Sequence, residues 1–157
     1  MSHTRVRPPE AVEVLRDEHR RLEALFVFFE GTAVDRRAER VRIWRQVDAL
    51  LAAHVQAEGG VLYPALERVY GDDRRIGDAR ETHRLLRDLR RSLEGLSPED
   101  NAHDAGRFDV VTAAVVEVVR IAMDEEEEGL YDLYRRLPPE ERRDISAALF
   151  AERRELG

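Results

Sequence analysis

Cysteine is absent from this chain of 157 residues, so disulfide bonds and thiolate chemistry are excluded. The sequence also lacks a run of about 18 apolar residues, and it therefore predicts no membrane-spanning helix. No apolar stretch typical of a signal peptide occurs near the N-terminus. The net charge of −7 argues against a nucleic-acid partner, because phosphate binding requires a basic face. These absences favour a cytoplasmic protein with no membrane or nucleic-acid partner.

The composition that remains is typical of amphipathic helices. Apolar residues make up 43% of the chain and charged residues 38%, with heavy use of Ala, Leu, Glu and Arg. Apolar side chains recur at the helical period in four long segments and in a shorter one near the C-terminus. The sequence therefore predicts an all-α fold, an antiparallel up-down four-helix bundle with a short fifth C-terminal helix. Residues 1–8 are expected to form a disordered lead-in, and residues 9–157 a single domain.

Caps and helix breakers predict the boundaries in the N-terminal half. Pro8-Pro9 opens the first helix, which ends near Gly31. Asp35 is the expected cap of the second helix. Gly59-Gly60 weakens this second helix, and Pro64 is expected to kink or end it before a further short helical piece.

Similar signals divide the C-terminal half into three helices. Asp78 is expected to cap the third helix, and residues 95–106 are predicted to form a loop. The fourth helix is predicted from about Phe108 to Leu137, and the fifth covers residues 140–156. Apolar side chains of the third and fifth helices are expected to face the core: Leu85, Leu86, Leu89, Leu93, Leu96, Ile145, Leu149 and Phe150.

One ionisable pair, His54 and Glu58, interrupts the apolar stripe of the second helix. The two residues are four apart, which places them on one face of a helix. The same face carries apolar residues on both sides of the pair, so both side chains should point into the core. An unpaired carboxylate buried there costs several kcal/mol, roughly, and requires a hydrogen-bond network, a counter-charge or a metal ion.

The other helices also carry inward polar residues. His19 lies within the apolar stripe of the first helix, and Glu126 lies at the centre of the stripe of the fourth, within the acidic run 124–128. His83 lies at the edge of the stripe of the third helix, where a half-exposed boundary position is the alternative. For His19 the alternative is a core histidine hydrogen-bonded to Glu23. His3 and His103 are expected to be exposed and without a role.

Three imidazoles and two carboxylates that converge in an apolar interior favour a metal site. Imidazole and carboxylate ligands together suit iron, manganese or zinc, and two carboxylates can bridge two ions. The interior of a helical bundle is a common place for such sites. The alternative is a buried ionic network without metal, which stabilises the fold little and requires every member to have a partner.

At these residues the sequence resembles the hemerythrin-like (HHE cation-binding) domain family. The family has a His on helix one, His-x-x-x-Glu on helix two, a His on helix three and His-x-x-x-Glu on helix four. By this resemblance, which covers roughly residues 10–137, the metal ligands are His19, His54, Glu58, His83 and Glu126. The family's Leu-(Phe/Tyr)-Pro signature is matched by Leu62-Tyr63-Pro64, and Leu130-Tyr131 follows Glu126 at the same distance.

The sequence departs from the family at one ligand position. The helix-four His should precede Glu126 by four residues, and that residue is Ala122. The resemblance implies that His19 and His54 bind one ion, whereas only His83 remains for the second. The second ion would then be under-liganded, more open or missing, unless a nearby carboxylate substitutes for the histidine: Glu23, Asp124 or Glu125.

Two classes of function follow from these residues. The resemblance implies a non-haem iron protein with two ions, or one, that binds or senses O2, peroxide or NO. Zinc and manganese remain alternatives, because the same ligands serve all three metals. The second class is a metal-poor or metal-free bundle that acts as an interaction or regulatory module. No residue apart from the ligands is placed as a general acid or nucleophile, so no catalytic residue is assigned.

Overall fold

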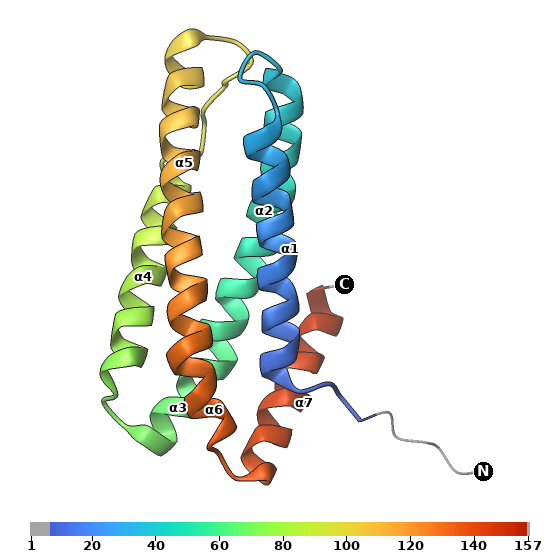
Figure 1. Ribbon diagram of the computed structural model, residues 1–157, viewed down its shortest axis with the longest axis vertical. Coiled ribbons are helices and arrows are strands. Elements are labelled where there is room, and N and C mark those ends of the chain that lie inside the picture. The colour runs from blue at the N-terminus through green and yellow to red at the C-terminus, as the bar shows by residue number, and fades with distance from the viewer. Residues whose placement is uncertain (1–6, 157) are drawn as a thin grey trace, which may run out of the picture.

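The computed structural model describes residues 7–156, and four helical rods run side by side through most of its length (Figure 1). The first rod is α1 (Ala11–Gly31), and the third is α4 (Arg74–Arg91). The second and fourth rods each contain a π-turn, and the remaining helix, α7 (Pro139–Leu156), packs against α1 near one end of the bundle. The second rod comprises α2 (Arg37–Ala57), η1 (Glu58–Leu62) and α3 (Tyr63–Tyr70), and the fourth comprises α5 (Ala102–Glu125), η2 (Glu126–Leu130) and α6 (Tyr131–Arg135).

The predicted architecture is confirmed. Successive rods run in opposite directions, and no strand occurs between residues 7 and 156 (Figure 1). None of the helices in this part of the chain is long and apolar enough to cross a membrane. The predicted disordered lead-in lies outside the described residues over positions 1–6.

Two helices begin earlier than predicted, because another residue, earlier in the chain, caps each of them. The side chain of Asp73 accepts a hydrogen bond from the Arg75 N–H, so α4 begins one turn before the expected cap Asp78. Asn101 accepts from the Asp104 N–H and caps α5, which therefore begins at Ala102 instead of Phe108. The second rod begins at Arg37 without a side-chain cap, so the expected cap at Asp35 was also wrong.

The core consists of two apolar clusters with the polar residues between them. One cluster includes Leu15 and Ala57, and the other includes Leu22 and Leu51. His19 and His54 fall between these pairs along α1 and α2. Two expected core residues, Leu85 and Phe150, are 48% and 45% exposed. The face of α4 that packs against the core carries Ile76, His83 and Leu86, so Leu85 points outward.

Arg40 of α2 holds the C-terminal end of α1. Its Nη1 donates to the carbonyl oxygens of Phe29 (2.9 Å) and Thr32 (2.8 Å), and its guanidinium lies 4.1 Å from the centre of the Phe29 ring. The last turn of α1 has no basic residue of its own. Arg40→Ala should therefore lower the free energy of unfolding by about 2 kcal/mol, a loss of about 6 °C in Tm for a domain of this size. Thermal melts of this variant and of the exposed control Arg42→Ala test the expectation; equal melting temperatures would contradict it.

Candidate metal centre

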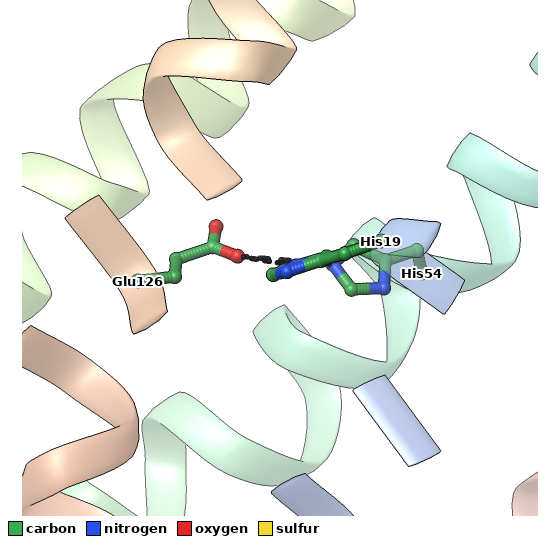
Figure 2. Close-up of side chains that lie close together, drawn as sticks. All are labelled: His19, His54 and Glu126. Carbon is green, nitrogen blue, oxygen red and sulfur yellow. Dashed lines mark hydrogen bonds and ion pairs between the residues drawn. The ribbon is translucent and has the colours of Figure 1, made fainter. Parts of the chain in front are cut away.

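All five predicted site residues converge in the middle of the bundle. His19 comes from α1, His54 from the last turn of α2 and His83 from α4, whereas Glu58 and Glu126 are the first residues of η1 and η2. All five side chains are buried, including His83, so the half-exposed alternative for His83 was wrong. Figure 2 shows His19, His54 and Glu126 pointing toward one another from three rods.

The ligand atoms form two groups that share Glu126. One group is His19, His54 and Glu126, the other is Glu58, His83 and Glu126, and the atoms within each group lie within 4.8 Å of one another. His19 Nε2 lies 3.1 Å from Glu126 Oε2 and 3.2 Å from His54 Nε2. Glu58 Oε1 lies 3.0 Å from His54 Nε2 and 3.5 Å from His83 Nε2. Glu58 and Glu126 are thus placed between the histidines of different rods.

Two further carboxylates fix the orientation of the histidine rings. Glu127 Oε1 lies 2.8 Å from His19 Nδ1, and Glu18 Oε2 lies 2.7 Å from His54 Nδ1. An ionised carboxylate can only accept, so each Nδ1–H donates and each Nε2 faces the cluster. Metal-binding histidines are commonly held in this way. The sequence indicated no role for either carboxylate. In the alternative interpretation of His19 its partner was Glu23, whereas in the structure it is Glu127.

Each of the two π-turns places a tyrosine on the same side of its rod as the glutamate that begins the turn. In η1 the Tyr63 N–H donates to the Glu58 carbonyl, and in η2 the Tyr131 N–H donates to that of Glu126. This hydrogen bond joins residues five apart, as in a π-helix, and it places each tyrosine on the same inward face as its glutamate. The Tyr63 hydroxyl lies 3.1 Å from His83 Nε2, and the Tyr131 hydroxyl lies 3.1 Å from His19 Nε2. The repeated Glu-x-x-x-Leu-Tyr pattern was the sequence signal for both tyrosines.

The second rod does not end at Pro64, and the short helical piece expected after it is α3. Pro64 lies in the first turn of α3, directly after η1, and the second rod continues to Tyr70. A proline is tolerated in a first turn because the N–H that it lacks would have no partner there. Gly59-Gly60, which were expected to weaken the second helix, lie within the π-turn η1.

Burial and charge shift the pKa values in the cluster in opposite directions. Burial alone would lower the pKa of His54, but the carboxylates of Glu58, Glu126 and Glu18 hold it well above its usual value. Burial would raise the pKa of Glu58, but His54 and His83 lower it well below its usual value. Burial, and then the charge of Glu58, raise the pKa of Tyr63 and of Tyr131. The buried carboxylates thus require positive charge beside them, which protonated histidine or a metal ion supplies.

The residues fit a metal centre better than a self-sufficient ionic network. Glu58 Oε1 is completely buried and lies 3.0 Å from His54 Nε2, yet it accepts no well-formed hydrogen bond from any residue between 7 and 156. Two imidazole Nε2 atoms, of His19 and His54, face each other at 3.2 Å, and at most one of a pair can donate to the other. A network without metal would leave such groups poorly satisfied, whereas carboxylate and imidazole lone pairs that converge suit iron, manganese or zinc.

Ala122 lines a cavity where the family has its fourth histidine. The cavity has a volume of about 390 Å³ and lies between α4 and the junction of α5 with η2. Its lining includes Ala122 and the buried Glu126, together with the exposed side chains of Asp78, Glu125 and Glu128. The buried carboxylate is therefore adjacent to a solvent-open space on the side of the second group.

None of the three carboxylates considered as substitutes for the missing histidine lies in the cluster. Both oxygens of Glu23 accept from Arg120, at 3.0 and 2.8 Å. Asp124 and Glu125 are exposed. His103 is exposed as expected, and His3 lies outside the described residues.

A four-helix bundle with imidazoles and carboxylates from all four rods in its core defines a class of helical metal-binding proteins. The chain belongs to the hemerythrin HHE cation-binding domain family, whose model matches residues 10–134. Its fold is similar to the crystal structure of a hemerythrin HHE cation-binding domain-containing protein from Mycobacterium kansasii, with a TM-score of 0.65 and 21% sequence identity. That similarity covers 94% of this chain and 89% of the other. No curated protein matches the chain in sequence.

Proposed function

We propose that this protein is a non-haem iron protein with two ions in the bundle core, and that it binds or senses O2, peroxide or NO. The observation that carries the proposal is the pair of buried ligand groups that share Glu126. Family membership supports a bound cation. Zinc and manganese are the alternatives, because their ligand preferences overlap with those of iron.

In this proposal His19 and His54 would hold one ion and His83 the other, with Glu58 and Glu126 as the carboxylate ligands. Bound iron would supply reversible electron transfer toward a small oxidant or diatomic ligand. The protein's own contribution is orientation: Glu18 and Glu127 hold His54 and His19 with Nε2 inward. The apolar clusters on both sides of the site limit the access of water.

The cavity beside Ala122 is the proposed route for the small ligand. It reaches from the surface to Glu126, which belongs to both ligand groups. The second ion would have one histidine ligand fewer than the first, which would leave it more accessible to an exogenous ligand. This opening favours reduction of O2 or peroxide over reversible O2 carriage.

Metal analysis of the untagged protein as purified tests the proposal. We expect about two irons per chain and the near-ultraviolet absorption of an oxo-bridged pair. One metal per chain that is lost in His54→Ala would show that the second position does not bind, and would overturn the two-ion form. Negligible metal, even after anaerobic reconstitution with Fe(II), would overturn the iron function and leave an interaction module.

A further inference from the structure

The C-terminal helix α7 lies beyond the residues that the family model matches, yet one of its side chains reaches toward the metal centre. Arg153 is mostly buried, with 23% of its side chain exposed. Its Nη1 donates to the carbonyl oxygen of Ala53 at 3.0 Å, and its Nη2 donates to Oε1 of Glu18. Arg153 therefore connects α7 to both α1 and α2, at the residue directly before His54.

Glu18 connects Arg153 to a proposed metal ligand, because it also accepts a hydrogen bond from His54. Its other oxygen, Oε2, accepts from His54 Nδ1 at 2.7 Å, and the residue is only 6% exposed. A carboxylate buried to this extent needs hydrogen-bond donors for both oxygens, and the guanidinium of Arg153 serves the oxygen that His54 does not contact. Arg153, Glu18 and His54 thus form a continuous hydrogen-bonded chain from α7 to the cluster.

The carboxylate that contacts His19 differs from Glu18 in its exposure to solvent. The Glu127 side chain, which contacts His19 Nδ1, is 38% exposed and therefore solvated. Glu18 has little contact with water, so the position of its carboxylate depends on a side chain of the protein. This difference makes the orientation of His54, and not that of His19, dependent on α7.

We propose that Arg153 is a positioning residue of the metal centre: through Glu18 it holds the His54 ring with Nε2 toward Glu58. The inference rests on the proposed metal-binding function and assigns α7 a part in it. Arg153 does not hold α7 in place alone. Ile145 and Leu149 are buried, and the Ser146 hydroxyl accepts from the Ala11 N–H at 3.0 Å, so α7 should stay docked when Arg153 is replaced.

Anaerobic titration with Co(II), followed by visible absorption, tests the inference with Arg153→Ala and with the exposed neighbour Arg154→Ala as the matched control. Arg153→Ala should bind the tighter Co(II) ion about 10-fold more weakly, with an altered ligand-field spectrum, whereas Arg154→Ala should match the wild type. Arg153→Lys keeps the charge but not the two-pronged geometry, and it should recover part of the loss. Unchanged affinity and spectrum in Arg153→Ala would overturn the role.

A double substitution separates positioning from a merely structural effect. Glu18→Gln should weaken Co(II) binding about as much as Arg153→Ala, and the double variant should lose little more, because both act through one contact. Additive losses would contradict a shared path. Melting curves of the metal-free variants show whether α7 has undocked, since a lost helix would lower Tm far more than a lost ion pair.

A readout without metal distinguishes failure of this inference from failure of the iron function. In the metal-free protein, the hydrogen-bonded Nδ1–H proton of His54 should give a slowly exchanging NMR signal that persists in Arg154→Ala and disappears in Arg153→Ala. If the wild type binds no metal but this difference is seen, the positioning contact stands and the iron function fails. If the signal persists in Arg153→Ala, the positioning role is wrong.

Discussion

Glu126→Ala is expected to remove both metal ions, with a loss of affinity of at least about 100-fold. Within residues 7–156, Glu126 is the only residue that belongs to both candidate ligand groups, and its Oε2 lies 3.1 Å from His19 Nε2. His83→Ala should have a smaller effect, because His83 belongs to one group only. That variant should retain the ion held by His19 and His54.

Elemental analysis and Co(II) titration of the two variants measure this difference. Glu125→Gln is the matched control, because Glu125 precedes Glu126 on the same rod but its side chain is exposed. The control should bind like the wild type. Far-ultraviolet circular dichroism establishes that each variant keeps its helices. If Glu126→Ala retained a full ion per chain, the shared position of Glu126 between two metals would be wrong.

The helical period placed His19, His54, Glu58 and Glu126 inward, whereas it left His83 at the edge of its stripe, where the family resemblance supported it. Among five consecutive acids, it selected Glu126 as the inward one, and the structure buries that side chain while Asp124 and Glu128 are exposed. The period works here because each of these residues lies within, or directly after, a long regular helix whose apolar stripe is well defined. The same reasoning identified His54 and Glu58 as an inward pair.

The helical period did not identify features that depend on irregular backbone or on distant contacts. A π-turn adds a residue to the turn and shifts the phase of the helix by about 100°. This shift brings Tyr63 and Tyr131 beside the histidines, which a straight helix would not do. Glu18 lies about 100° from the stripe of α1, and it is buried beside Arg153 of α7, 135 residues further along the chain. No local pattern in α1 indicates that contact.

Ala122→His is expected to tighten binding of the second ion by about 10-fold or more, because it supplies the missing imidazole. The pair His54 and Glu58 shows the geometry that such a substitution should adopt. There the histidine lies four residues before the glutamate, and the two side chains meet at 3.0 Å. Ala122 lies at the same spacing before Glu126, and each glutamate opens a π-turn. The cavity of about 390 Å³ beside Ala122 has room for the ring.

Ala122→Leu is the matched control, since leucine fills part of the same cavity but offers no ligand atom. Stepwise Co(II) titration should therefore separate the two variants: the second binding step tightens in Ala122→His and not in Ala122→Leu. Both variants narrow the cavity, so both should slow the reaction of the loaded protein with a small oxidant if the cavity is the ligand's route. Equal Co(II) binding in the two variants would show that position 122 is not a ligand position. A tighter second step with unchanged reaction rates would keep the ligand position but place the route elsewhere, because filling the space would then not have hindered the oxidant.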